Sequence, residues 1–241
     1  MPTVIDAALI GDSHCRAIEA AAEAQGVTFR HTITGASPLF LHAAFTTAED
    51  GDLAFSPAPS HFDPATQPEK AITNKRAKTR KLTQGFRALF AEPVPVFITI
   101  GTGAHAFVSR ITTAQDSARL TDPFVSSRLA RKAASEFFAD YRALYQVIAQ
   151  ACPQVACLYA PTRFTDRTRD LWLTYDDNLE HEMLELGVEI LDMRRTLGDD
   201  TLHLRPEYHV DNPDDQVHAN PAWGAAVLDA IRAHPFLTGA R

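Results

Sequence analysis

Two short polar motifs at opposite ends of the chain carry the residue types that nucleophilic catalysis requires. Gly11-Asp12-Ser13-His14 lies near the N-terminus, and Asp215-Gln216-Val217-His218 lies near the C-terminus. A serine hydroxyl is a weak nucleophile until a base takes its proton, and that base needs a third group to fix its tautomer. Ser13, His218 and Asp215 supply these three types of group. The motifs therefore predict acyl transfer through Ser13, with His218 as the base and Asp215 as the carboxylate that orients it.

The surroundings of the two motifs strengthen this prediction. A Gly-Asp-Ser run alone is typical of turns, and an Asp and a His three residues apart are common on helix surfaces. Here the first motif directly follows an apolar run over residues 4–10, and the second precedes Asn220-Pro221, which is typical of a helix start. We therefore expect the nucleophile at a strand-to-helix turn and the base just before the last helix.

Neighbouring polar residues are given other roles. Asp12 lies in the nucleophile turn, where we expect it to accept bonds from backbone N–H groups. Asp211 and Asp214 stand at the wrong offset from His218 to orient its ring. Cys15 is expected to pack as a small apolar side chain on the first helix.

The bulk composition limits the class of protein. A chain of 241 residues with 45% hydrophobic and 22% charged residues suits one globular domain. Its formal net charge of −7 argues against nucleic acid as the main partner. The three cysteines are odd in number and lack metal-ligand spacing, so we expect reduced thiols. Neither a metal nor a cofactor is expected. The sequence shows neither a secretory signal nor an apolar run long enough for a bilayer, which predicts a cytoplasmic protein without a membrane partner.

Apolar runs alternate with helical patterns along the chain. Strands are predicted over residues 4–10, 27–33, 94–101, 154–160 and 187–193. Helices are predicted over residues 14–25, 82–91, 125–150, 168–186 and 220–233. This alternation indicates a parallel sheet covered by helices on both faces. Ligands of such sheets bind beyond the carboxyl ends of the strands, where Ser13, Gly35 and Gly101 fall.

Residues 46–81 break this alternation, because they are polar, rich in proline and without a clear period. They are predicted to form an irregular insertion within a single domain that spans residues 1–241. The segment closes on six cations: Lys70, Lys75, Arg76, Lys78, Arg80 and Lys81. These cations either attract an anionic substrate or form the solvated start of a helix, and the second interpretation is favoured.

Both motifs resemble those of the SGNH hydrolases, also called the GDSL family. Gly11-Asp12-Ser13-His14 resembles the family's nucleophile block, in a variant found in domains linked to polysaccharide O-acetylation, and Asp215-Gln216-Val217-His218 resembles its last block. The resemblance spans the chain in element order. It implies a flavodoxin-like α/β/α sandwich with a five-stranded parallel sheet. It also implies an esterase for small acyl esters, acetyl first and with carbohydrate esters as candidates, or an O-acyltransferase that uses the same triad on a sugar hydroxyl.

The resemblance further implies an oxyanion hole, which departs from the family pattern here. The family offers a glycine N–H after the second strand, fitted by Gly35, and an Asn after the third, where this chain has Gly103. The candidate replacements are the His105 ring and the backbone N–H of Gly103 or Ala104, beside the N–H of Ser13 itself. Loss of an oxyanion donor costs about 100- to 1,000-fold in turnover. The alternatives are thus a substitute donor, a slow enzyme, or a non-catalytic binding protein with this fold.

His14 and Arg163 are the candidate substrate contacts. His14 follows the nucleophile directly and is expected in the wall of the site. Arg163 follows the fourth predicted strand, where it either meets a charged part of the substrate or forms a structural ion pair. His203 and His209 show no metal-ligand pattern. A nucleotide-binding role is disfavoured, because no Gly-x-Gly-x-x-Gly run follows the first strand.

Overall fold

The computed structural model describes residues 2–47, 53–118, 126–212, 214–215 and 217–239. Its elements, in chain order, are β1 (Thr3–Gly11), α1 (Cys15–Ala24), β2 (Val27–Thr34), η1 (Ser37–Leu39), β3 (Ala44–Thr47), β4 (Leu53–Ser56), η2 (Pro59–Phe62), α2 (Glu69–Ala91), β5 (Val96–Ile98), α3 (Ala104–Ser117), α4 (Ser127–Ala151), β6 (Val155–Leu158), α5 (Arg169–Glu185), β7 (Glu189–Leu191), α6 (Arg194–Leu197), η3 (Pro206–Tyr208), α7 (Pro221–Ala233) and α8 (Pro235–Thr238).

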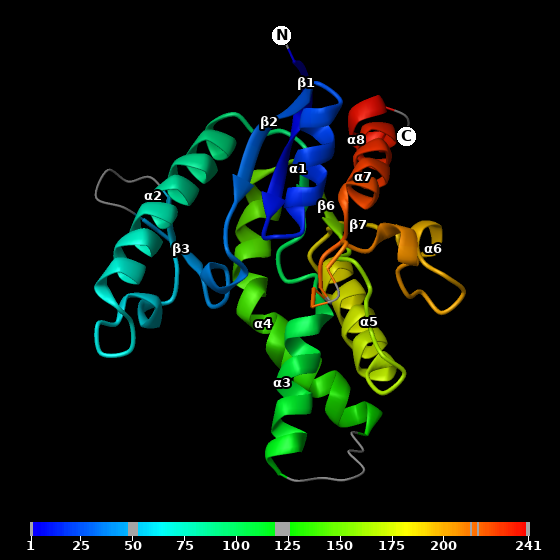
Figure 1. Ribbon diagram of the computed structural model, residues 1–241. Coiled ribbons are helices and arrows are strands. Elements are labelled where there is room, and N and C mark those ends of the chain that lie inside the picture. The colour runs from blue at the N-terminus through cyan, green and yellow to red at the C-terminus, as the bar shows by residue number, and fades with distance from the viewer. Residues whose placement is uncertain (1, 48–52, 119–125, 213, 216, 240–241) are drawn as a thin grey trace.

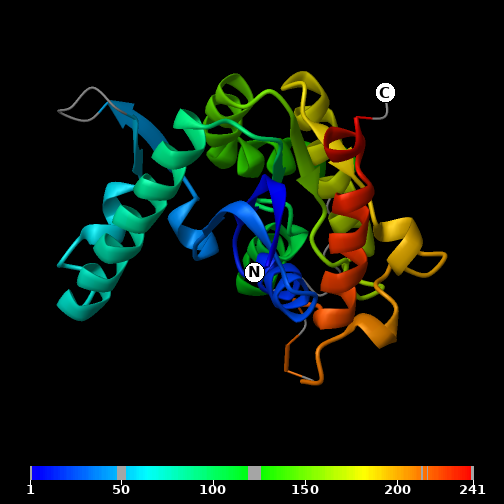
Figure 2. The ribbon, with the colours of Figure 1, turned by 90° about the horizontal axis from the view of Figure 1, so that it is seen from above.

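Five strands form one parallel sheet in the order β2-β1-β5-β6-β7. Helices α1 and α7 cover one face, and α2 to α5 lie on the other (Figures 1 and 2). This confirms the predicted α/β class with a five-stranded parallel sheet between helical layers. The order reverses between β1 and β5, so the carboxyl ends of these two strands flank the crevice in which ligands of such sheets bind.

The apolar pattern of β1 explains why the sheet is covered on both faces. Successive side chains of a strand point to opposite faces. Ala7 and Leu9 pack towards α1 and α7, whereas Ala8 and Ile10 pack towards α2 and α4, and all four are fully buried. A strand in the middle of a doubly covered sheet has no polar face, which is why this run is continuously hydrophobic.

Helices α1 and α7 pack directly on each other at Gly224. A Cβ atom at this position would lie 2.0 Å from the carbonyl oxygen of Ala17 and 2.9 Å from the backbone nitrogen of Ile18. Only glycine permits such an approach of one helix to the backbone of another. Because α1 starts just after Ser13 and α7 starts just after His218, this contact brings together the two ends of the chain that carry the motifs.

The segment predicted as an irregular insertion is more regular than expected. Within residues 46–81, the structure shows the antiparallel hairpin of β3 and β4 and the short helix η2, and α2 begins at Glu69. Residues 48–52 lie outside the described part. The first turns of α2 could not be predicted from apolar periodicity, because Ile72 is the single buried residue among them. Their Ala, Lys and Arg residues do favour a helix by intrinsic propensity.

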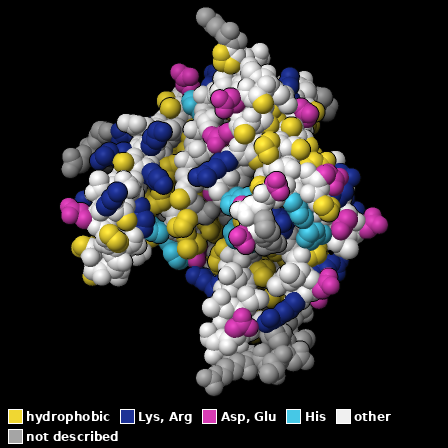
Figure 3. Space-filling model, viewed as in Figure 1, with side chains coloured by type: hydrophobic (Ala, Val, Ile, Leu, Met, Phe, Trp, Pro, Cys, Tyr) yellow, Lys and Arg dark blue, Asp and Glu magenta, His cyan; other side chains and the backbone are white. Residues whose placement is uncertain are grey.

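The cations of this segment lie on the outer side of α2. Seven Lys or Arg residues and one Glu fall within the helix. Lys70, Arg76, Lys78, Arg80 and Lys81 are exposed and form no ion pair with any residue that the structure describes. The side of α2 that faces the protein is apolar, with Leu82, Phe86 and Leu89 buried. Figure 3 shows Lys and Arg side chains gathered over the lobe that α2 forms beside the main body.

Two further differences concern element length and number. Strands β5, β6 and β7 are shorter than predicted, because flanking apolar residues such as Ile100 and Tyr159 are buried outside the strand ladder. Helix α3 was not predicted. Its buried residues are few and only Phe107 is large, so its sequence shows little periodicity. None of the described helices is long and apolar enough to cross a membrane.

Candidate active site

Ser13 lies at the carboxyl end of β1, in the turn that leads into α1. Gly11 ends the strand, and a Cβ atom there would lie 2.1 Å from Thr99 Oγ1 and 2.3 Å from Cys15 Sγ, so the turn has room only for glycine. The buried Asp12 accepts the backbone N–H of His14 at 3.1 Å, which confirms its predicted role in the turn. These contacts leave Ser13 partly exposed beyond the carboxyl end of β1, next to the point where the strand order reverses between β1 and β5.

The second motif meets Ser13 across 205 residues of sequence. Nε2 of His218 lies 2.8 Å from Ser13 Oγ, and Nδ1 of His218 lies 2.9 Å from Asp215 Oδ2. An ionised carboxylate only accepts hydrogen bonds, so Nδ1 carries the proton and Nε2 is the unprotonated nitrogen that accepts from the Ser13 hydroxyl. The structure thus places the His218 ring between Ser13 and Asp215, with one hydrogen bond to each, as the sequence predicted.

Asp215 is held as a carboxylate by several donors. Its Oδ1 accepts the backbone N–H groups of Val217 at 3.0 Å and of His218 at 2.9 Å, in addition to the His218 ring. Burial alone would raise the pKa of Asp215, but these hydrogen bonds outweigh it and lower the pKa to about 2. The group therefore stays charged at neutral pH, as an orienting carboxylate must. Asp211 and Asp214 are exposed and do not contact the His218 ring, as expected.

The loop after β5 forms the opposite wall of the site and is held by two buried tyrosines. Tyr145 of α4 donates its hydroxyl to the carbonyl of Ile100 at 2.7 Å, and Tyr175 of α5 donates to the carbonyl of Gly101 at 2.6 Å. Gly101 has a φ of +71°, which only glycine adopts without strain. Gly103 has a φ of −84°, so the need for a positive φ falls at Gly101 and not at Gly103.

Gly103 precedes α3, and two imidazoles converge on it. A Cβ atom on Gly103 would lie 2.7 Å from Nδ1 of His105 and 3.2 Å from Nε2 of His14. The His14 ring has neighbours in both His105 and His218, with centroid distances of 5.8 Å to the His105 ring and 5.5 Å to the His218 ring. The space that a side chain at position 103 would need is therefore filled by the His105 ring.

Burial keeps both additional imidazoles neutral. Desolvation, assisted by the neighbouring His14, lowers the pKa of His105 to about 4. Desolvation also lowers the pKa of His14, which is 3% exposed. Neither ring nitrogen of His14 has a hydrogen-bond partner within the described residues. A buried polar group of this kind ordinarily has a partner, so His14 is available to a molecule that enters the site.

The structure contradicts the expected contribution of Gly35. Its N–H donates to the carbonyl of Gly11 at 2.9 Å and so extends the pairing of β1 with β2 by one residue. This backbone N–H is already used by the sheet and does not face an oxyanion. By contrast, the N–H groups of Ser13 and Gly103 have no acceptor in the described part of the chain.

Of the two interpretations of Arg163 made from the sequence, the structural ion pair is wrong, whereas the substrate contact stays a prediction. Its guanidinium donates to the backbone carbonyls of Asp215 and His218, and it forms no ion pair with a described carboxylate. No feature of the sequence signals this contact, because it depends on how two distant loops fold over each other.

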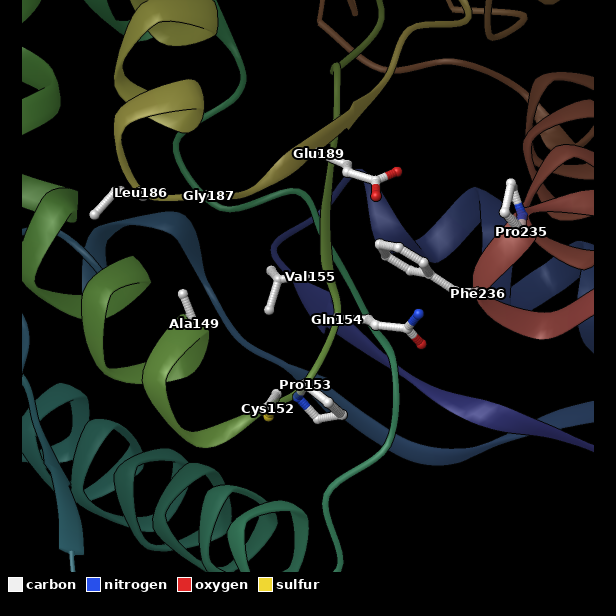
Figure 4. Close-up of a pocket in the computed structure, with 10 residues that line it drawn as sticks. All are labelled: Ala149, Cys152, Pro153, Gln154, Val155, Leu186, Gly187, Glu189, Pro235 and Phe236. Atoms are coloured by element: carbon white, nitrogen blue, oxygen red, sulfur yellow. The ribbon is translucent and has the colours of Figure 1, made fainter. Parts of the chain in front are cut away.

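The structure offers no second nucleophile beside Ser13 at Cys15 and shows a cavity away from the site. Cys15 is fully buried, and burial raises the pKa of its thiol, so it is not a competing nucleophile. No group of described residues has the arrangement of a metal site. A polar cavity of about 310 Å³ opens between the ends of α4 and α5 and the start of α8 (Figure 4). It lies at the amino ends of β6 and β7, whereas Ser13 follows the carboxyl end of β1.

No protein-family model matches the chain, and no curated protein matches its sequence. Among solved structures, the chain is similar to the crystal structure of LAE5, an alpha/beta hydrolase enzyme from the metagenome of Lake Arreo, Spain. The two share 15% sequence identity at a TM-score of 0.45, over 97% of this chain and 95% of that one. A likeness of this size does not bear on activity, which has to be argued from the site itself.

Proposed function

We propose that this protein is a serine esterase that hydrolyses small acyl esters, acetyl esters first. The observation that carries the proposal is the hydrogen-bonded chain from Ser13 through His218 to Asp215, with Nε2 of His218 at 2.8 Å from the hydroxyl of the nucleophile. The resemblance of both motifs to the SGNH hydrolases supports the same assignment. The proposed substrates are small-molecule or carbohydrate esters met in the cytoplasm.

In the proposed reaction, His218 Nε2 takes the proton of Ser13 while the serine oxygen attacks the ester carbonyl. Asp215 accepts the Nδ1 proton in a hydrogen bond and stabilises the imidazolium without taking that proton. The tetrahedral intermediate collapses, and His218 returns its proton to the departing alcohol. A water molecule then attacks the acyl-serine, His218 takes the water's proton, and this proton returns to Ser13 as the acid leaves.

The oxyanion that develops on the ester carbonyl needs hydrogen-bond donors close to Ser13. Because the Gly35 N–H is used by the sheet, we assign the role to the N–H groups of Ser13 and Gly103 and to the His105 ring. The lowered pKa of His105 keeps the ring neutral, and a neutral imidazole still carries one N–H donor. The unpartnered His14 ring, beside both His105 and His218, is assigned to the substrate-binding wall.

We expect His105→Ala to lower turnover by about 10- to 1,000-fold with little change in KM, because an oxyanion contact exists mainly in the transition state. Gly103→Asn alone should not help, since its Cβ would lie 2.7 Å from Nδ1 of His105. The double variant Gly103→Asn/His105→Ala makes room for the Asn amide, and we expect it to recover part of the turnover that His105→Ala loses.

Steady-state kinetics on an activated acetyl ester measure the turnover and KM of these three variants. Unchanged turnover in His105→Ala would assign the oxyanion to backbone N–H groups alone. An equal loss in the single and double variants would show that an amide at position 103 does not reach the oxyanion.

Substrate size gives a separate prediction. The His218 ring bonds to Ser13, the His14 ring lies 5.5 Å from that of His218, and the His105 ring lies 5.8 Å from that of His14. This side of the site is therefore polar, and no long apolar lid is evident in the sequence. We therefore expect acetyl and other short acyl esters to be preferred over long ones. A series of p-nitrophenyl esters of increasing chain length measures this preference. A maximum at about eight carbons or more would contradict it, since each buried methylene would then contribute about 0.8 kcal/mol.

Two alternatives are separated by the fate of the acyl group. An O-acyltransferase would use the same triad but pass the acyl group to a sugar hydroxyl, so acetylated product would form when sugar acceptors are supplied with an acetyl donor. A non-catalytic binding protein would show neither hydrolysis nor transfer. Assays on p-nitrophenyl acetate and on acetylated sugars, with and without acceptor sugars, test the proposal against both.

A further inference from the structure

Arg163 lies at the point where three loops meet behind the candidate triad. Its Nη1 donates to the carbonyl of Asp215 at 2.5 Å and to the carbonyl of His218 at 3.3 Å. Its Nη2 lies 3.3 Å from Nδ1 of His209. One guanidinium therefore touches the backbone of both the orienting carboxylate and the base, although it touches neither of their side chains.

The partners of His209 fix its tautomer. Nε2 of His209 lies 2.9 Å from the carbonyl of Leu204, and a carbonyl only accepts, so Nε2 carries the proton. Guanidinium groups only donate, so the unprotonated Nδ1 of His209 accepts from Arg163. His209 thereby accepts from Nη2 while the two carbonyls accept from Nη1, so the two nitrogens of the guanidinium are held by different loops.

Backbone bonds tie the same loops together. Leu204 donates its N–H to the carbonyl of Thr162 at 2.8 Å, next to Arg163 in the chain. Asn220, which caps α7, donates its N–H to the carbonyl of Tyr208 and its side-chain amide to the carbonyl of His209 at 3.0 Å. The loop after β6 and the segment around η3 thus form a frame on which the Asp215–His218 turn rests.

The two functional side chains of the turn are partly open to solvent. The side chains of Asp215 and His218 are 25% and 37% exposed. Position on such a surface depends on hydrogen bonds, and bonds from a charged donor are roughly twice as strong as neutral ones. A two-pronged guanidinium also fixes direction, which a lysine ammonium does not.

From these contacts we infer that Arg163, held by His209, is a positioning residue that fixes the distance from His218 to Ser13 and is not a substrate-binding residue. The inference rests on the proposed function. Its failure is distinguishable from failure of that function, because one of its readouts is the hydrogen bond between His218 and Asp215, which requires no substrate.

The test compares Arg163→Met, Arg163→Lys and His209→Leu with Arg205→Met as the matched control. Arg205 lies in the same group of loops but donates to the carbonyl of Thr196 and contacts neither Asp215 nor His218. We expect the first three variants to lower kcat by about 10- to 100-fold with less than about a twofold change in KM, because geometry is lost and substrate binding is not. His209→Gln, which keeps an acceptor and a donor, should lose less than His209→Leu.

The second readout is the far-downfield proton NMR resonance of the Nδ1–H that His218 shares with Asp215. We expect it to broaden or shift in Arg163→Met and His209→Leu and to be unchanged in Arg205→Met. A further variant, Arg163→Ala, leaves space for a free guanidinium ion. Guanidinium added at low millimolar concentration should raise the turnover of this variant, whereas sodium at equal ionic strength should not.

Three results would overturn the inference. One is an unchanged resonance together with unchanged kcat in Arg163→Lys and His209→Leu. Another is a rise in KM of tenfold or more at constant kcat, which would make Arg163 a substrate contact after all. The third is an equal effect in Arg205→Met, which would reduce the role of Arg163 to general stability of the loops.

Discussion

Ser13→Ala and His218→Ala are each expected to lower kcat on an activated acetyl ester by about 10⁴-fold or more while leaving the fold intact. Either change removes a member of the hydrogen-bonded chain in which Ser13 Oγ lies 2.8 Å from His218 Nε2, and neither residue is part of the apolar core. Because the two side chains act as one unit, the double variant should lose little more than either single one. Asp215→Ala should be milder, since the orienting group contributes less than the base.

The measurement combines initial rates with a thermal melt of each variant. Ser60→Ala is the matched control, because Ser60 is an exposed serine in η2, far along the chain from either motif. It should retain full turnover. Wild-type turnover in Ser13→Ala would show that another residue carries the nucleophile, and a melting temperature lowered in parallel with activity would show that the loss reflects unfolding.

Gly224→Ala is expected to destabilise the protein and to lower activity together. The new Cβ would lie 2.0 Å from the carbonyl oxygen and 2.3 Å from the carbonyl carbon of Ala17, which are backbone atoms of α1 and cannot rotate away. Helices α1 and α7 must therefore separate. Overpacking of this kind costs about 1–3 kcal/mol, occasionally more, which corresponds to a fall in Tm of roughly 2–12 °C for a domain of this size. Since α1 follows Ser13 and α7 follows His218, their separation should also lengthen the hydrogen bond between Ser13 Oγ and His218 Nε2.

The comparison variant is Gly85→Ala in α2. It too replaces a helical glycine, but its Cβ would lie 3.1 Å from Cγ1 of Ile33, a side-chain atom that can shift. We expect a change of less than about 1 kcal/mol in either direction, because the gain in helix propensity offsets the tighter contact. A Tm and turnover for Gly224→Ala equal to those of the wild type would show that the close approach of α1 and α7 does not position the triad.

Much of the fold could be predicted because the sheet is central and doubly covered. Strands β1, β5 and β6 are largely apolar and buried, whereas the edge strand β2 alternates buried apolar residues with exposed polar ones. The alternation of strands with helices favours parallel order. The triad could be predicted for a related reason: Ser13 directly follows such a strand, and His218 stands just before the Asn220 cap of the last helix. A residue that adjoins a predictable strand or helix can be placed from the sequence, because the position of that element is itself predictable.

The failures concern backbone groups and loops. The Gly35 N–H could face an oxyanion only if the pairing of β1 with β2 ended one residue earlier. It instead bonds to Gly11, and no side-chain pattern in the sequence indicates where this pairing ends. The partners of Arg163 depend on how the loop after β6 meets the Asp215–His218 turn. The first half of α2 has too few apolar residues to show a period, so its cations were placed in an irregular segment.

A fluorophosphonate probe applied to the intact protein tests the central claim most directly, since phosphonylation requires an activated serine hydroxyl and no knowledge of the natural substrate. We predict one adduct per chain, located on Ser13 by peptide mass spectrometry and nearly absent in His218→Ala, with Ser60→Ala labelled like the wild type. No adduct on folded protein, an adduct on another residue, or equal labelling of His218→Ala would contradict the assignment of Ser13 as a nucleophile activated by His218.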